Sequence, residues 1–281
     1  MDLPADTSLP FFSYGLFRPG QIGFQKLRED VAGHTAGWSI SGRVKERDGL
    51  PVLLEARHDS DEAEGTLIEF IPARQKAAYQ SIADIEPEKL YRWVSVEARK
   101  GPELRIANVL LGRSGDSGSH DMEYLPWDGS RDLLFTKALE VVQEVLDQNR
   151  GFDWELRPTL HLQMAYMLLW SAIERFASFK YHLGKDVTAK VKKLADEPAV
   201  RATLLELSPE PRRVVHSTDP GRKATLTASD PKKAIDYYYQ LRSNVVHRGK
   251  SAPNDHGKLV KSLEELLTIF RRVLEAEFRL D

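Results

Sequence analysis

The first half of the chain alternates short apolar runs with turn residues. Phe11–Tyr14 is an apolar run that ends at Gly15, and Tyr91–Ala98 alternates and is rich in valine and aromatic residues. Two further β-rich runs cover Pro51–Glu55 and Gly65–Ile71. Runs of this length and composition predict strands, whereas the segment 73–82 has the composition of a helix. The pattern predicts a mixed α/β domain.

From Ser130 onward the apolar spacing becomes helical. It predicts five helices on short connections, at Asp132–Gln148, Leu160–Leu183, Asp186–Asp196, Pro231–Arg248 and Gly257–Phe278, with a proline-containing loop at about 207–229. Five such helices are typical of an α-helical bundle. The Gly/Ser-rich segment Gly112–Ser119 is expected to be a mobile loop or the linker. We therefore predict an α+β protein with two domains, residues 1–126 and 127–281.

Composition narrows the class of protein. The chain has no cysteine, which excludes disulfides, thiolate nucleophiles and cysteine-based zinc sites and suits a reducing cytosol. Its first ten residues have neither the basic nor the apolar region of a signal peptide. The most apolar stretch, Met164–Ile173, is about half as long as a membrane span. We expect a cytoplasmic protein with no membrane partner.

Charge is distributed unevenly. Lys+Arg minus Asp+Glu is 15 − 20 = −5 for residues 1–126 and 25 − 22 = +3 for residues 127–281. Six cations lie in or just after the proline-containing loop: Arg212, Arg213, Arg222, Lys223, Lys232 and Lys233. They indicate either a solvated loop or a surface that contacts the phosphates of RNA.

The segment from Pro231 has the clearest local signals of a helix. Asp230 can cap its N-terminus, and Gly249 can adopt the left-handed conformation after its last turn. Arg242 lies inside the apolar arc, and because a guanidinium stays charged, burying it requires a partner. His247 lies on the last turn, where the helix dipole favours the protonated imidazole. An Arg-x4-His spacing alone is weak evidence, and Arg175 and His182 form a rival pair.

The sequence "YYYQLRSNVVHRGK" resembles the late helix of HEPN domains, and "YMLLWSAIERFASFKYHL" resembles their early helix; together they cover roughly residues 130–281. The resemblance implies a homodimer that cleaves RNA without a metal or other cofactor, the ribose 2′-OH attacking the adjacent phosphate. His247 would be the general acid/base, Arg242 would stabilise the phosphoryl charge, and Ser243, Asn244 and Glu174 would support them. Ser243 stands where the family often has Asn or Asp. The alternative is that Arg242 pairs with Glu174 only to hold the bundle together, while His247 caps the helix.

The sequence "FFSYGLFRPG", followed by "EGTLIEFIP" and "IADIEPEKLYRWVSVEA", resembles the γ-glutamylcyclotransferase-like fold over about residues 9–113. The resemblance implies a ligand-binding loop at Tyr14, Gly15 and Leu16, with Glu86 as catalytic acid/base. Apolar neighbours in the sequence, Ile82, Ile85 and Leu90, predict a raised pKa for Glu86. Departures from the family pattern are found at Phe17, Ala83, Pro87 and Trp93. The alternatives are a turn glycine with a surface glutamate, and a pocket that senses a metabolite.

Three functions follow from these patterns. The first is a ribonuclease, such as a toxin or antiviral effector, with a small-molecule-binding N-terminal domain. The second is an enzyme of γ-glutamyl metabolism whose helical half only dimerises it. The third is a binding protein with neither activity.

Overall fold

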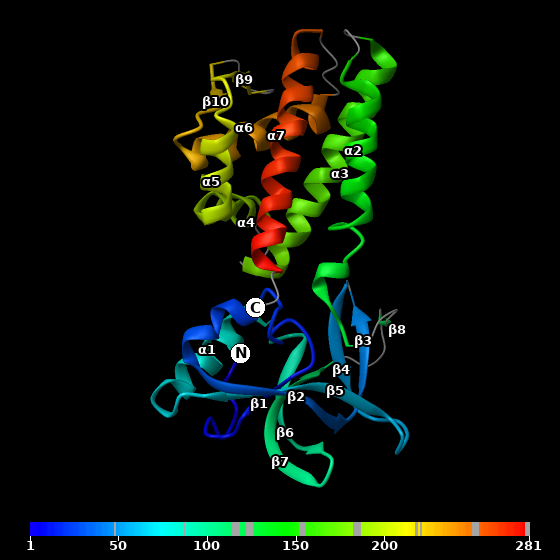
Figure 1. Cartoon of the computed structure of the whole chain (residues 1–281), viewed down its shortest axis with the longest axis vertical. Coiled ribbons are helices and arrows are strands. Elements are labelled where there is room, and N and C mark those ends of the chain that lie inside the picture. Colours follow the sequence, from blue (N-terminus) through cyan, green and yellow to red (C-terminus); the bar gives the residue numbers. More distant parts are fainter. Residues whose placement is uncertain are drawn as a thin grey trace. The chain divides into compact units, whose positions relative to one another are not determined.

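The computed structural model describes residues 1–47, 49–86, 88–113, 119–121, 126–151, 155–181, 187–216, 219, 221–248 and 253–278. Side chains at 120, 187, 190, 247, 248 and 253–255 are outside the description. The chain forms two compact units. The first comprises Met1–Asp132 together with Phe278, and the second comprises Leu133–Glu277. Strands dominate the first and helices the second, so the chain is α+β (Figure 1).

The N-terminal unit is built on a closed five-stranded barrel. Its strand order is β1-β5-β2-β6-β7, with bounds Phe11–Ser13 for β1, Glu62–Phe70 for β5, Val31–Ser41 for β2, Tyr91–Lys100 for β6 and Glu103–Gly112 for β7. β1 pairs antiparallel with β5 and parallel with β7. This parallel pairing closes the barrel, which protects strand edges that would otherwise be open.

One face of the barrel's strands is apolar. Alternate residues along these strands, among them Phe12, Trp38, Ile40, Leu67 and Val109, form one buried cluster together with Leu53 from outside the barrel. Gly65 lies where a Cβ atom would be 2.6 Å from the ring of Phe12, so the barrel is packed closely around β1. That packing fixes the end of β1, from which the segment Tyr14–Leu16 continues.

Shorter elements surround the barrel. A second sheet has the order β4-β3-β8, with β4 at Leu50–Leu54, β3 at Arg43–Arg47 and β8 at His120–Asp121. Three 3-10 turns lie at Phe24–Lys26, Arg28–Asp30 and Gly129–Arg131, and a fourth, Pro72–Arg74, leads into helix α1 at Gln75–Ile85. α1 buries one face, and the Tyr79 hydroxyl on that face donates to the Leu9 carbonyl oxygen at 2.7 Å. α1 ends at Ile85, so Glu86 is the residue that leaves the helix.

The C-terminal unit is a helical bundle with one small hairpin. Its helices are α2 (Lys137–Asn149), α3 (Leu156–Tyr181), α4 (Val187–Lys192) with a 3-10 turn at Lys193–Asp196, α5 (Pro198–Leu207), α6 (Pro231–Arg248) and α7 (Pro253–Glu277). The hairpin strands are β9 (Arg213–Val215) and β10 (Lys223–Thr225). α3 carries several fully buried aromatic side chains, among them Tyr166, Trp170 and Phe176. Tyr166 packs edge-on against Trp170, and Phe176 packs edge-on against Phe270 on α7.

The structure differs from the sequence-based elements in several places, and it contains two long strands, β2 and β7, that the sequence pattern did not predict. Helix α5 was not predicted, and the hairpin lies within the segment predicted to be a loop. The units divide after Asp132, whereas the sequence placed the boundary after residue 126. In the Gly/Ser-rich segment, Gly112 still belongs to β7, and residues 114–118 lie outside the described residues.

Candidate functional site

Helix α6 begins as its sequence predicts. The Asp230 carboxylate accepts the Lys233 backbone N–H at 3.1 Å, which identifies Asp230 as the N-cap. This bond lowers the pKa of Asp230 below its ordinary value. Ala234, Ile235, Tyr238 and Leu241 are buried along the helix. The capped start and the buried face fix the position of Arg242 along and around the helix.

Arg242 has the partner that its burial requires. Its Nη2 donates to Oε1 of Glu174 on α3 at 3.0 Å, and the two side chains are 21% and 25% exposed. The guanidinium carbon lies 5.6 Å from the centre of the Tyr239 ring, and Nε is buried with no hydrogen-bond partner among the described residues. An ion pair that is partly open to solvent can bind an anion as well as hold two helices together.

The two predicted histidines cannot be placed in this geometry. His247 lies on the last turn of α6, but its side chain is outside the description, and Gly249 lies outside the described residues. His182, the partner in the rival pair, lies outside them too. The Arg175 guanidinium of that pair lies 4.3 Å from the centre of the Phe179 ring on its own helix.

The two residues after Arg242 face different surroundings. Asn244 is 3% exposed, and its Nδ2 donates to the carbonyl oxygen of Val215 in β9 at 2.9 Å. Asn244 Oδ1 accepts from Gln240 Nε2 at 3.0 Å. Asn244 therefore ties the hairpin to α6, whereas Ser243 lines an adjacent hollow.

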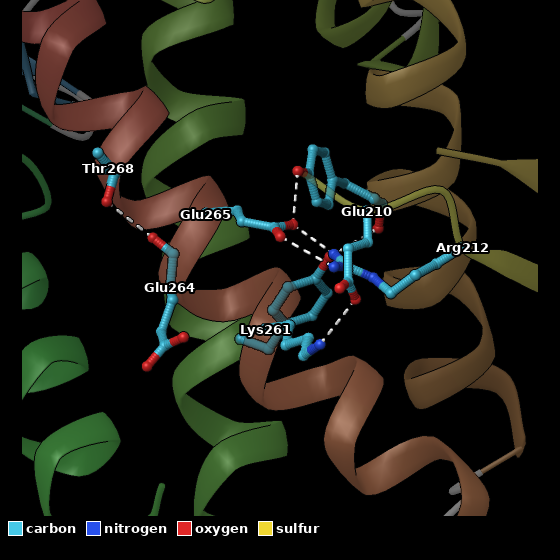
Figure 2. Close-up of polar contacts among 8 residues, drawn as sticks. Glu210, Arg212, Lys261, Glu264, Glu265 and Thr268 are labelled. Atoms are coloured by element: carbon cyan, nitrogen blue, oxygen red, sulfur yellow. Dashed lines mark hydrogen bonds and ion pairs between the residues drawn. The ribbon is translucent and has the colours of Figure 1, made fainter. Parts of the chain in front are cut away.

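Arg212 fits neither of the two roles that the sequence indicated, a solvated loop cation or a phosphate contact. It forms two hydrogen bonds with Glu265 on α7, one of them from Nη1 to Oε1 at 2.9 Å, and its side chain is only 11% exposed (Figure 2). The Tyr238 hydroxyl donates to the same carboxylate at 2.9 Å. Because its guanidinium is engaged inside the unit, Arg212 does not belong with the cations that contact phosphates. Arg213, the next residue, is exposed.

A hollow of about 570 Å³ lies beside this hairpin. Four cationic side chains line it, Lys192, Arg222, Lys223 and Lys233, with one carboxylate, Asp236. Tyr239 and Ser243 of α6 also line it. The hollow therefore brings together two of the predicted RNA-binding residues, Arg222 and Lys223, with two lysines from other elements.

In the N-terminal unit, Tyr14, Gly15, Leu16 and Glu86 come together as the sequence predicts. All four line one cavity, whose volume is only about 20 Å³. A Cβ atom on Gly15 would be 2.2 Å from Pro51 Cγ, so this position requires glycine. The Tyr14 hydroxyl donates to the Leu110 carbonyl oxygen at 2.9 Å. A cavity of this size holds about one water molecule.

Glu86 has an unusual protonation equilibrium. Burial raises its pKa to about 7, although the charge of Arg47 acts in the opposite direction. Tyr14 and Tyr91 lie close enough that the Glu86 charge raises the pKa of both hydroxyls further, beyond the effect of burial. The predicted direction of the Glu86 shift is confirmed, but Leu90 is 36% exposed, and the buried neighbours include Tyr14, Tyr91 and Pro51.

Sequence reasoning missed four residues around these two cavities. Arg47 lies 5.9 Å from the centre of the Tyr91 ring, and Lys192 reaches the cationic hollow from α4. Glu265 holds Arg212, and the Tyr91 hydroxyl donates to the Pro51 carbonyl oxygen at 3.4 Å. Each of these contacts joins residues from different elements, which the sequence pattern did not connect.

Two classes of feature are absent from the described part of the chain. None of its helices is long and apolar enough to cross a membrane. Within the same residues, no three His, Cys, Asp or Glu side chains are grouped so that they would hold a metal ion.

Comparisons with protein-family models, with curated proteins and with solved structures found no match to this chain. The two resemblances in the sequence therefore depend on the residues that carry them.

Proposed function

We propose that the helical unit is a metal-independent endoribonuclease of the HEPN type that acts as a homodimer, for example as a toxin or antiviral effector. The observation that carries this proposal is the ion pair between Arg242 and Glu174 at 3.0 Å. It unites the late-helix arginine and the early-helix acid that the resemblance requires, although they are 68 residues apart in the sequence.

In the proposed reaction, the ribose 2′-oxygen attacks the adjacent phosphorus and the bond from phosphorus to the 5′-oxygen breaks. A base removes the 2′-OH proton, and an acid protonates the departing 5′-oxygen, which leaves a 2′,3′-cyclic phosphate and a 5′-hydroxyl. His247 of one copy and His247 of the other can fill the two roles in a composite site. Arg242 would use its free donors to stabilise the charge that develops on the phosphoryl oxygens.

A dimer requires a surface on which the two copies meet. Helix α3 exposes three apolar side chains at four-residue spacing, Leu156 at 56%, Leu160 at 45% and Met164 at 70%. The exposed ridge continues through Ser171 to the partly exposed Glu174. Residues at this spacing share one helix face, and large exposed apolar patches mark interaction sites. A two-fold interface along this ridge would bring two Arg242–Glu174 pairs together.

Cleavage in EDTA tests the proposal. The wild type should cut single-stranded RNA and leave 2′,3′-cyclic phosphate ends. His247→Ala should lose at least ~10²-fold in rate, the usual effect of removing a general acid/base. Arg242→Lys should also cleave RNA much more slowly than the wild type, because a single ammonium group cannot replace a planar guanidinium that contacts two phosphoryl oxygens.

Two controls make this result decisive. Both variants should keep the dimer mass of the wild type in light scattering, so that lost chemistry is separated from lost assembly. Arg175→Ala and His182→Ala report on the rival pair. Cleavage that survives His247→Ala but is abolished by Arg175→Ala and His182→Ala would assign the site to the rival pair. A wild type that never cuts RNA would refute the ribonuclease altogether.

The second candidate function is γ-glutamylcyclotransferase chemistry in the N-terminal unit, and the pKa of about 7 at Glu86 favours it. A carboxyl with this pKa can take a proton from an attacking amine at neutral pH and return it to the leaving amine. The cavity of about 20 Å³ would have to open before a γ-glutamyl group could enter. Glu86→Gln should abolish any 5-oxoproline product without unfolding the unit. A wild type that forms no such product leaves this pocket as a sensor of a small ligand.

A further inference from the structure

The cationic hollow beside α6 has the properties of a built binding site. Its volume of about 570 Å³ lies within the range of small-ligand pockets. Its walls come from three separate segments: α4, the β10 strand with the residues flanking it, and α6. A hollow with walls from several elements can surround a ligand, which a single exposed helix face cannot do.

The charge of the hollow is strongly unbalanced. Four cationic side chains face one carboxylate. Lys192 is 3.4 Å from Asp236 and Lys233 is 3.3 Å from Asp230, so those two lysines are partly neutralised. Among the described residues, neither Arg222 nor Lys223 has an acidic partner within ion-pair distance. Like charges collected in a concave surface repel one another, and an anion removes that repulsion.

The part of the hollow that carries Arg222 and Lys223 is held in place from two sides. Arg212, just before β9, is bound by Glu265 on α7, as Figure 2 shows, and Asn244 of α6 binds the carbonyl oxygen of Val215. The hairpin is also closed beside Lys223, because the His216 backbone N–H donates to the Arg222 carbonyl oxygen at 2.9 Å. A ligand therefore meets a hairpin that is already positioned, which lowers the entropic cost of binding.

The part of the α6 wall formed by Tyr239, Gln240 and Ser243 is uncharged and includes one aromatic ring. The Tyr239 hydroxyl and Thr188 Oγ1 are 3.1 Å apart, and the Tyr239 ring packs edge-on against Trp170 with ring centres 5.5 Å apart. Gln240 and Ser243 add hydrogen-bonding groups on the same side. A cationic wall facing an aromatic and amide wall matches a ligand with phosphates at one end and a planar base or a sugar at the other.

We propose that this hollow binds one nucleotide, with its phosphates on Arg222 and Lys223 and its nucleoside against Tyr239 and Gln240. The nucleotide is either free or one unit of an RNA strand. Binding here does not require that the unit cleaves RNA. If the unit does, Tyr239 connects the two sites, because its ring lies 5.6 Å from the Arg242 guanidinium.

The test is calorimetric titration of the full chain in EDTA with three probes: ATP, inorganic tripolyphosphate and a 2′-O-methyl pentanucleotide, which cannot be cut by 2′-OH attack. ATP or the pentanucleotide should bind more tightly than tripolyphosphate. The double variant Arg222→Gln/Lys223→Gln should weaken that binding at least ~tenfold, because both charge-assisted phosphate contacts are removed. Arg272→Gln, which removes an exposed cation of α7 outside the hollow, should bind like the wild type.

Each outcome decides a part of the proposal. Binding of ATP identifies a free-nucleotide site, and binding of the pentanucleotide alone identifies a subsite for the strand. Tripolyphosphate that binds as tightly as ATP overturns the nucleoside half. Absence of binding by all three probes at 50 mM salt, or equal binding by the double variant and the wild type, overturns the whole. Because cleavage is not measured here, the result is independent of the His247 experiment.

Discussion

The interior carboxylates of the helical unit are paired with cations, whereas Glu86 of the barrel unit is not, although Asp30 and Asp61 of that unit are paired with Arg74 and Arg43. In the helical unit, Glu174 and Glu265 each meet an arginine, and Glu197 and Glu277 share Lys180, whose Nζ lies 2.8 Å and 2.5 Å from their oxygens. In the barrel unit, Glu86 has no ion-pair partner among the described residues, and its pKa rises to about 7. A paired carboxylate holds elements together, whereas a buried carboxylate without a cationic partner has a raised pKa and exchanges protons near neutral pH.

The two units also differ in the space that they offer a ligand. Glu86 lines a cavity of about 20 Å³ in the barrel unit. The helical unit has a hollow of about 570 Å³, in which Arg222 and Lys223 have no acidic partner among the described residues. The barrel unit thus has an acid/base group with little room for a substrate, and the helical unit has both room and charge for one. This contrast is why we propose the helical unit as the main site of function and give the barrel unit second place.

The largest expected effect comes from removing one side of a buried ion pair. Arg212→Met leaves Glu265 charged inside the helical unit, where the two side chains are 11% and 14% exposed. We expect the free energy of unfolding of that unit to fall by about 3–5 kcal/mol. The double variant Arg212→Met/Glu265→Leu should recover much of this loss, because no uncompensated charge is left. Urea unfolding of both proteins measures the difference, and equal stability of Arg212→Met and wild type would remove the structural role of the pair.

The second effect concerns Glu86 and depends on pH. The ordinary pKa is 4.5 and the folded value is about 7, so the unfolded chain ionises first as the pH rises. Wild type should therefore lose stability between pH 4.5 and 7 relative to Glu86→Gln, which does not titrate. The two proteins should be alike at pH 4. At pH 8, Glu86→Gln should be more stable by ~3 kcal/mol.

Other carboxylates titrate over the same range, so the comparison has to be the difference between the two proteins at each pH. Chemical unfolding of the N-terminal transition at pH 4 and pH 8 supplies it. A difference that does not change with pH would mean that Glu86 ionises normally in the folded protein, and the barrel unit would then resemble the helical unit in keeping its carboxylates charged.

The third effect tests how closely the loop after β1 is packed. Gly15→Ala places a methyl group 2.2 Å from Pro51 Cγ, and we expect a loss of about 1–3 kcal/mol from overpacking. Gly33→Ala in β2 is the matched control, because the nearest heavy atom to its Cβ would be a Glu69 oxygen at 4.0 Å. Thermal unfolding of the two variants should separate them clearly. If they unfold alike, the cavity at Glu86 is looser than its volume indicates.

Local rules were sufficient for part of this structure. Asp230 caps α6 because its short side chain can accept a backbone N–H from the first turn of the helix that begins at Pro231. Arg242 required a partner because a guanidinium cannot lose its charge. The direction of the Glu86 pKa shift was also predictable, because burial destabilises the charged form of a carboxyl group and so raises its pKa.

Contacts between distant elements were not predictable in this way. Arg212 lies in a segment rich in prolines and charges, which is typical of a solvated loop, and its partner Glu265 is 53 residues away on a helix with many glutamates. Lys192 belongs to a short basic helix that gave no sign of sharing a hollow with β10. The charge pattern identified the cations, but only the tertiary structure separates Arg212, which is held inside, from Arg222 and Lys223, which line the hollow.

The smallest effect belongs to a second ion pair that joins the same two segments. Lys261 on α7 and Glu210, two residues before Arg212, are 3.1 Å apart, and Figure 2 draws both beside the Arg212–Glu265 pair. Their side chains are 55% and 79% exposed, so water screens the attraction, and each side chain keeps much of its hydration whether or not the pair forms. Lys261→Ala should therefore change the free energy of unfolding by less than ~1 kcal/mol. This variant breaks a contact between the same segments as Arg212→Met, so comparison of the two separates joining the segments from burying the charges. A loss as large as that of Arg212→Met would mean that joining the segments matters more than desolvation, and the contrast between buried and exposed charges in this unit would have to be abandoned.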